Sequence, residues 1–286
     1  MDIEQARTFL AIAAHGSFLE AAGRLYVTQS TVSARIQSLE RELGARLFVR
    51  NRAGATLTPS GQRFLHHAKT LVLTAEQARH DVGLPSRFRA ALRVGGRIAL
   101  WEGFLPSWVG WMRREAPDVS IRSEIGFEED LMRRLVEGTL DIGLMYTPSH
   151  SPGLVVEHLF DETLIMVSTR TDTRWPDTDY VYVEWGPGFY ARHREAYPDL
   201  ERPPQVVNIG WLGVQLVVAN GGSCFLPERM ARGLIEQGRL HRVPDAPEFP
   251  LPAYMVFPRA TESDVLAQAV EGLRSLAQEE RSWRGA

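Results

Sequence analysis

Apolar residues recur every three or four positions along the first part of the chain, which is the spacing of amphipathic helices. Such helices are expected over residues 2–14, 18–25 and 29–43. The residues placed to cap or end them are Ser17, Thr28, Gly16 and Gly44. The pattern therefore predicts a group of short helices joined by tight turns.

Two strands and a long helix are expected next. The strands are 47–49 and 55–57, separated by the turn NRAG, and the helix, 59–82, begins with Pro59 after the capping residue Thr58. Because a small domain cannot cover the whole apolar stripe of so long a helix, a second copy of the helix is the expected cover. The residues expected in that dimer interface are Phe64, Leu65, Ala68, Leu71, Val72 and Ala75.

After the segment 84–91, which is expected to be a hinge, the pattern changes to alternating strands and helices. Strands such as 92–96 and 119–125 alternate with helices such as 101–115 and 128–137. This alternation indicates an α/β body with a mostly parallel sheet. The body is long for a single sheet, so two lobes are expected.

The third predicted helix has two different faces. Val32, Ile36 and Leu39 form a buried stripe, whereas the other side carries short, uncharged side chains. This polar arc consists of Gln29, Ser30, Ser33, Ala34 and Gln37. A solvated helix face normally carries Glu and Lys, but glutamine can pair with adenine, and serine can bond a base edge, in the DNA major groove. The arc predicts a DNA-recognition helix, and the alternative is a helical packing domain with an ordinary polar face.

The two short strands complete a winged helix-turn-helix, in which the recognition helix contacts bases and the strand turn contacts phosphate. Arg50 and Arg52 lie at that turn, and Thr56 and Thr58 can add neutral phosphate donors. Residues 1–89 hold 12 Arg or Lys and 7 Asp or Glu, a balance of +5. The remainder holds 20 and 28, a balance of −8, which gives the net charge of −3. A basic N-terminal part on an acidic body indicates an anionic partner for that part alone.

The N-terminal sequence “FLAIAAHGSFLEAAGRLYVTQSTVSARIQSLERELGARLFVRNRAGATLTPSG” resembles the DNA-binding domain of LysR-type transcriptional regulators. The resemblance rests on many positions at fixed spacing over residues 1–65, among them “QSTVS” at the start of the recognition helix and “LERELG” at its end. Looser matches follow in the expected order, such as “EAPDVSI”, “LVEGTLDIGLM” and “NGGSCFLPERMA”. The segments “ALWE” and “VEWGP” are similar to the HdfR branch of this family.

The resemblance implies a two-domain regulator that binds double-stranded DNA at an interrupted inverted repeat, as a homodimer or homotetramer, with RNA polymerase as a further candidate partner. Its implied parts are a winged helix-turn-helix over 1–58, a linker helix over 59–83, the hinge 84–91, and an α/β effector domain of the type 2 periplasmic-binding-protein fold over 92–286, with lobe I at 92–162 and 264–286 and lobe II at 163–263. The candidate DNA-binding residues are Ser17, Thr28, Gln29, Ser30, Thr31, Ser33, Arg35, Gln37, Arg50, Arg52, Thr56 and Thr58.

Two positions depart from the family's pattern. Ser30 stands where the family often has proline, and Ala34 stands where it often has arginine. The neighbouring Arg35 lies off the base-facing arc of the helix, so we expect it to contact phosphate or to pack at the flank. Base specificity is then expected to depend mainly on Gln29, Ser30 and Ser33.

The body offers one candidate ligand site. In open α/β sheets a ligand lies beyond the carboxyl ends of the strands, where helix N-termini favour an anion. Arg97 follows the first strand of the body, and Trp101 and Phe127 offer rings for stacking, so we expect a small organic anion, carboxylate-bearing, between the lobes. The alternatives are a surface salt bridge for Arg97 and core packing for the rings. The candidate effector-binding residues are Arg97, Ile98, Ala99, Trp101, Phe127, Met145, Tyr146, Thr147, Asn208 and Ile209.

Enzyme chemistry has no support in the sequence. There is no P-loop, GxGxxG or GxSxG motif and no metal-ligand spacing of histidines, so no cofactor or metal is expected. Cys224, the single cysteine, fits a buried strand in a reducing compartment. The apolar runs are shorter than a membrane span, and the charged first helix is unlike a signal peptide, so the cytoplasm is expected. The alternative functions are an enzyme with an accessory helical domain and a ligand-binding module that does not bind DNA.

Overall fold

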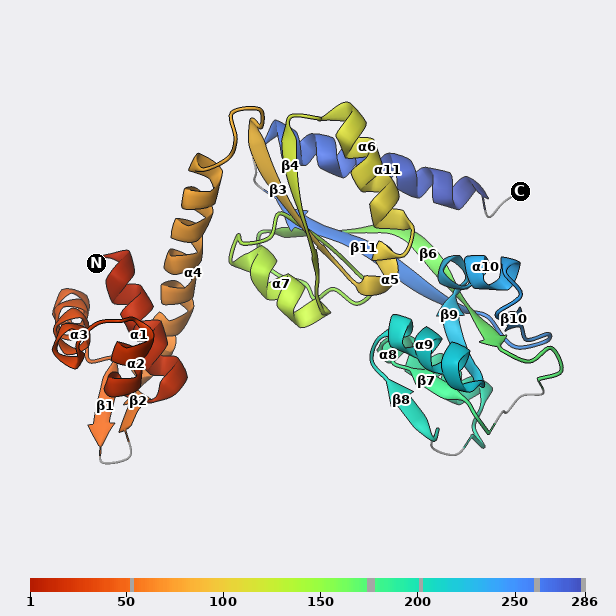
Figure 1. Cartoon of the computed structure of the whole chain (residues 1–286), viewed down its shortest axis with the longest axis horizontal. Coiled ribbons are helices and arrows are strands. Elements are labelled where there is room, and N and C mark those ends of the chain that lie inside the picture. The colour runs from red at the N-terminus through yellow and green to blue at the C-terminus, as the bar shows by residue number, and fades with distance from the viewer. Residues whose placement is uncertain (52–53, 174–177, 201–202, 260–262, 284–286) are drawn as a thin grey trace. The chain divides into compact units, whose positions relative to one another are not determined.

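The computed structural model (Figure 1) describes residues 1–51, 54–173, 178–200, 203–259 and 263–283. The chain divides into two compact units, Met1–Leu84 and Pro85–Ala286, each with its own hydrophobic core. The division falls at the start of the segment expected to be the hinge. None of the described helices combines the length and the hydropathy that a membrane-spanning segment requires.

The N-terminal unit is a group of helices with a small antiparallel sheet, in the order α1 (Ile3–His15), α2 (Phe18–Arg24), α3 (Gln29–Leu43), β1 (Phe48–Asn51), β2 (Gly54–Leu57) and α4 (Pro59–Val82). Its helix ends form as the sequence predicts. Ser17 accepts a hydrogen bond from the backbone N–H of Glu20, and Thr28 accepts one from that of Thr31. Gly44 ends α3 with a φ of 64°, a left-handed conformation that glycine adopts without strain.

Aromatic residues from α1, β1 and α4 form the centre of this unit. Phe9 contacts Phe48 and Phe64, with ring centroids 5.1 and 5.0 Å apart. Phe64 is 8% exposed and Ala68 is fully buried in the same core. The prediction that these two residues lie in a dimer interface is therefore wrong, because α1 of the same chain already covers the first half of α4.

The second half of the apolar stripe on α4 is less covered. Leu65 and Val72 are partly buried against the domain core, whereas Leu71 is 36% exposed and Val82 is 89% exposed. Ala75 is also partly exposed. An interface through α4 is therefore still available to a second copy, but it begins farther along the helix than the sequence pattern indicated.

The second unit alternates strands and helices in the order β3 (Ala90–Gly96), α5 (Ile98–Trp101), α6 (Phe104–Glu115), β4 (Val119–Ile125), α7 (Glu128–Val136), β5 (Ile142–Met145), β6 (Leu154–Ser168), β7 (Val181–Val183), α8 (Pro187–Ala196), β8 (Gln205–Val207), α9 (Gly210–Asn220), β9 (Ser223–Pro227), α10 (Glu228–Glu236), β10 (His241–Arg242), β11 (Phe249–Pro258) and α11 (Asp264–Trp283). The helix expected over 101–115 begins only at Phe104, as α6, and Trp101 is instead the last residue of the short helix α5. Gly103 lies at the break with a φ of 107°, a conformation that other residues rarely adopt.

The main sheet of this unit is mixed. Its strand order is β10-β6-β11-β5-β3-β4, with β9 also paired to β6. β3 runs parallel to β4 and β5, but β11 is antiparallel to β5 and β6, and β6 is antiparallel to β9 and β10. The expected mostly parallel sheet is thus wrong, because the long strands β6 and β11 run antiparallel to each other and to their other partners in the sheet. These two strands run from the part of the unit that holds α6, α7 and α11 to the part that holds α8, α9 and α10 (Figure 1).

Candidate DNA-binding and effector-binding sites

The polar arc of α3 lies on the surface of the N-terminal unit. Val32, Ile36 and Leu39 are buried, which turns the opposite side of the helix outward. On that side Gln29, Ser30, Ala34 and Gln37 are exposed, and Thr31 and Ser33 are partly exposed. The helix thus presents short, mostly hydrogen-bonding side chains at the surface, as a major-groove contact requires.

Hydroxyl groups gather at the first turn of α3. The Thr28 Oγ1 lies 2.8 Å from Ser30 Oγ and 2.9 Å from Thr31 Oγ1, while it also accepts the Thr31 backbone N–H. This cap fixes the start of the helix, and the three hydroxyl groups stay accessible to solvent. Such a terminus favours contact with an anionic group such as phosphate.

Arg35 packs at the flank of α3. Its Nη1 lies 3.3 Å from the Thr8 hydroxyl and 3.3 Å from the Glu4 carboxylate, both on α1. The guanidinium therefore connects two helices of the unit. This geometry agrees with the expected position off the base-facing arc, and it favours the packing role over the phosphate contact.

The turn between β1 and β2 and the residues beside it hold the predicted phosphate contacts. Arg52 and the side chain of Arg50 lie outside the described residues. Thr56 is exposed on β2, but Thr58 donates its hydroxyl proton to the Arg46 carbonyl at 2.7 Å and accepts the Gly61 backbone N–H at 3.0 Å. Thr58 is therefore the helix cap that the sequence predicts, and its hydroxyl is not available as a phosphate donor.

Sequence reasoning missed Tyr26 in the turn between α2 and α3. Its side chain is 96% exposed, and its φ of 54° lies in the left-handed region that few non-glycine residues adopt. The signal was a large aromatic side chain in a tight turn directly before the recognition helix.

Arg97, at the carboxyl end of β3, is the centre of the predicted effector site. It is only 8% exposed. Its Nη1 lies 3.4 Å from the Glu128 carboxylate, its Cζ lies 4.6 Å from the centroid of the Phe127 ring, and its Nη2 donates to the Asn208 carbonyl at 3.5 Å. The structure thus brings Arg97, Phe127 and Asn208 together. It also pairs Arg97 with Glu128, so the salt-bridge alternative is met in part, although the arginine is buried and does not lie on the surface.

Other predicted effector residues belong to the core. The indole N–H of Trp101 donates to the Glu124 carbonyl at 3.0 Å, and the partly buried ring packs against Gly96. Ala99 and Met145 are buried, which makes direct ligand contact by them wrong, because helix and strand packing already occupies their side chains. The three remaining positions, Ile98, Thr147 and Ile209, are partly or fully exposed.

A buried ionic cluster lies beside this site. The guanidinium of Arg229 on α10 pairs with Glu162 on β6, and their side chains are 7% and 0% exposed. Arg229 also donates to the carbonyls of Ala99 and Glu102, which joins α10 to α5. Burial alone lowers the pKa of Arg229, but the carboxylate of Glu162 raises it overall. Tyr146, a predicted effector residue, donates to Glu162 at 3.5 Å, so its hydroxyl belongs to this cluster.

Comparison with known proteins gives one family for both units. Residues 3–62 match “Bacterial regulatory helix-turn-helix protein, lysR family”, and residues 86–278 match “LysR substrate binding domain”. The chain is 30% identical over 278 residues to the HTH-type transcriptional regulator HdfR of Yersinia enterocolitica serotype O:8 / biotype 1B, over 93% of this chain and 94% of that protein. The predicted similarity to the HdfR branch is confirmed.

Solved structures share the fold over nearly the whole chain. Full-length CbnR complexed with its target DNA has a TM-score of 0.69 at 21% identity, over 96% of this chain and 100% of CbnR. Full-length LysG from Corynebacterium glutamicum with bound effector Arg has a TM-score of 0.55 at 20% identity, over 98% of this chain and 99% of LysG. Together with the two family matches, these findings show that the chain belongs to the LysR family of DNA-binding transcriptional regulators and is a regulator rather than an enzyme.

Proposed function

We propose that this regulator binds an interrupted inverted repeat in double-stranded DNA as a homodimer or homotetramer. The exposed, uncharged arc of α3 carries the proposal, since it lies at the surface and its side chains are of the kinds that hydrogen-bond base edges. A two-fold dimer places two such arcs in successive major grooves. Leu71 and Val82 offer exposed apolar contacts for the pairing of two α4 helices.

Gel shifts with genomic fragments test the DNA-binding proposal. We expect discrete complexes with fragments that contain an inverted repeat, and a dimer or tetramer in analytical ultracentrifugation. Replacing Arg50 and Arg52 by alanine should weaken binding to every sequence and flatten its salt dependence, because phosphate contacts release counterions. A monomer that binds all fragments equally would contradict the proposal.

We further propose that a small organic anion, carboxylate-bearing, binds between the two lobes at Arg97. The observation that carries this is a buried guanidinium already paired with a carboxylate, that of Glu128, and covered by the Phe127 ring. The site therefore has the donor, the apolar cover and the charge that an anionic ligand needs. The full-length LysG structure with its bound effector supports a small-molecule ligand for this regulator as well.

Glu128 occupies the position that an effector carboxylate takes in this proposal. Effector binding exchanges an internal carboxylate for an external one, which leaves Glu128 free to turn toward solvent at the start of α7. Since Arg97 also contacts the Asn208 carbonyl from the second lobe, this exchange changes contacts on both lobes at once. The ligand thereby shifts the population of lobe arrangements, and with it the way the dimers sit on DNA.

A melting-temperature screen with small organic acids tests this site, because a ligand that binds only the folded chain raises the melting temperature. Arg97→Ala should abolish the shift, and Glu128→Gln should strengthen binding, since the internal competitor loses its charge. Arg122→Ala is a matched control, because that arginine is 64% exposed and far less buried than Arg97. An unchanged ligand shift in Arg97→Ala would remove the anion site and leave the DNA-binding proposal intact.

A further inference from the structure

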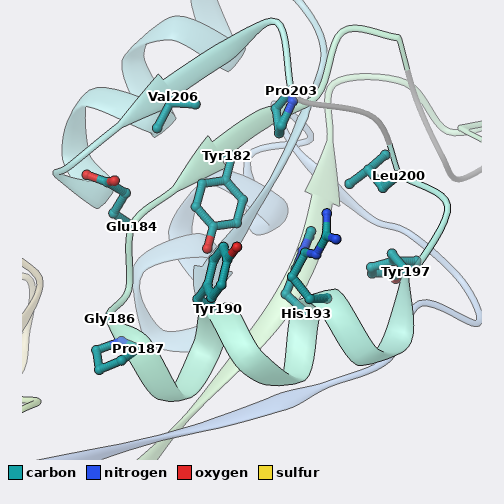
Figure 2. A pocket seen from close by; sticks show the side chains of 11 residues that line it. Tyr182, Glu184, Gly186, Pro187, Tyr190, His193, Tyr197, Leu200, Pro203 and Val206 are labelled. Carbon is teal, nitrogen blue, oxygen red and sulfur yellow. The ribbon is translucent and has the colours of Figure 1, made fainter.

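A cavity of about 720 Å³ lies in the second unit between α8, β7 and β8 (Figure 2). Its volume is in the range of small-molecule sites. None of the predicted effector residues lines it, so the proposed function does not account for it. Its lining includes the aromatic and apolar side chains of Tyr182, Tyr190, Tyr197, Leu200, Pro203 and Val206.

The cavity follows from how α8 is packed. Phe189 and His193 face inward and are 1% and 3% exposed, whereas Tyr190, roughly 80° around the helix from them, is 58% exposed. Tyr197 directly follows the end of α8 and also lines the cavity. Tyr182 projects to the same side from β7, beside Tyr190 in Figure 2, because its neighbours in the strand face α9. The fold thus keeps several tyrosines at the edge of an open cavity.

The charges at the cavity differ between its two ends. Among the described residues no hydrogen bond or ion pair engages the side chains of Glu184 or Arg194. Burial, and then the charge of Glu184, raises the pKa of Tyr182 to about 12, and both side chains line the cavity. Arg194 is seven residues beyond Pro187, roughly 10 Å along the helix axis, and Glu184 precedes the start of that helix.

His193 adds no positive charge to the lining. Its Nε2 lies 3.0 Å from the Tyr180 hydroxyl, and burial lowers its pKa to about 4, so the ring is neutral at pH 7. The end of the cavity near Glu184 therefore combines tyrosine ring faces with a negative charge. Ring faces and a carboxylate are the groups that bind organic ammonium ions.

We propose that this cavity binds a small free organic cation, an ammonium compound with an aromatic or apolar body. The ammonium lies against Tyr182 and Tyr190 near Glu184, and the body extends along α8 toward Leu200. This site is separate from the anion site at Arg97. The regulator then has two ligand sites of opposite charge preference in its effector domain.

Calorimetric titration of the full chain with benzyltrimethylammonium tests the cation site, with benzyl alcohol and phenylacetate as its neutral and anionic counterparts. We expect saturable binding of the cation at one site per chain and weaker binding of both counterparts. Tyr190→Ala and Glu184→Gln should each weaken cation binding about tenfold. Both residues are exposed, so their variants should fold like the wild type, and an unchanged melting temperature checks this.

Two further variants test the charge of the ligand that binds and the location of its site. Arg194→Ala should leave cation binding unchanged or make it tighter, whereas an anion site would bind more weakly. Arg97→Ala should leave cation binding unchanged, which separates this cavity from the proposed effector site. Stronger binding of phenylacetate, loss of cation binding in Arg97→Ala, or no saturation by the cation at millimolar concentrations would each overturn the proposal.

Discussion

The recognition helix and the Arg97 site present their functional side chains in opposite ways. In α3 one continuous segment supplies the candidate contacts, and most of them are exposed. At Arg97 the contacts come from the end of β3, the start of α7 and the segment before α9, and the arginine is buried. An exposed site can lose contacts without a change in folding stability. A buried site couples ligand recognition to the packing of the domain.

Among the variants that test this comparison, Arg229→Ala is expected to have the largest effect, a loss of folding stability in the second unit. The substitution leaves the carboxylate of Glu162 buried without its guanidinium partner, at a cost of about 3–5 kcal/mol in unfolding free energy. Urea denaturation followed by tryptophan fluorescence measures it, because all seven tryptophans lie in the second unit. Loss of the links to Ala99 and Glu102 should also loosen α5 beside Arg97.

Arg242→Ala is the matched control for Arg229→Ala. Arg242 also pairs with carboxylates of the second unit, those of Glu228 and Glu248, but its side chain is 49% exposed. An exposed pair contributes less than about 1 kcal/mol. Similar small losses of unfolding free energy in both variants would show that burial does not determine the cost of breaking an ion pair. That result would contradict the proposed difference between exposed and buried sites.

Acid should weaken the second unit through His193. Burial, with Arg194 nearby, lowers the pKa of His193 to about 4, whereas the unfolded residue titrates near about 6.5. Because the folded pKa is the lower one, the unfolded chain takes up the proton first. The stability is therefore complete above about pH 6.5 and is lost as the pH falls toward about 4, by up to about 3 kcal/mol.

Urea denaturation at pH 7 and pH 5, again followed by tryptophan fluorescence, measures this loss. His193→Gln should reduce the pH dependence, because glutamine takes up no proton. The exposed His66 and His67 on α4 serve as the comparison in the first unit, and their replacement should leave the pH dependence of the second unit unchanged. A wild-type stability that is equal at both pH values would contradict the role of His193.

The first unit could be predicted closely because its signals are local. Thr28 caps α3 through a residue three positions on, and Gly44 ends the same helix. The second unit depends on contacts between distant residues. Glu162 and Arg229 are 67 positions apart, and Trp101 donates to a carbonyl 23 positions away, so no local pattern contains either contact. The predicted effector residues do lie at or just after strand ends, but packing between distant segments decides which of them are accessible.

Replacing Gln29 and Ser33 by alanine tests the exposed site of the two, the recognition helix α3. Because each base contact contributes about 1–3 kcal/mol of discrimination, the double variant should lose most preference for its operator over a scrambled sequence. Its unfolding free energy should change by less than about 0.5 kcal/mol, since these side chains lie on the surface. Competition gel shifts measure the preference. Gln62→Ala, exposed on α4, is the control that should keep it.

The smallest expected effect concerns Tyr26, where stability and binding should change in opposite directions. Its left-handed backbone costs roughly 1 kcal/mol for a non-glycine residue, and its exposed ring recovers little of that within the unit. Strain retained at an exposed aromatic residue beside the recognition helix favours a contact with the DNA backbone. Tyr26→Asn should slow hydrogen exchange in α2 and α3, because asparagine tolerates this conformation better, and should weaken binding to all sequences alike. Slower exchange with unchanged DNA affinity would show that the tyrosine is strained without serving the interface.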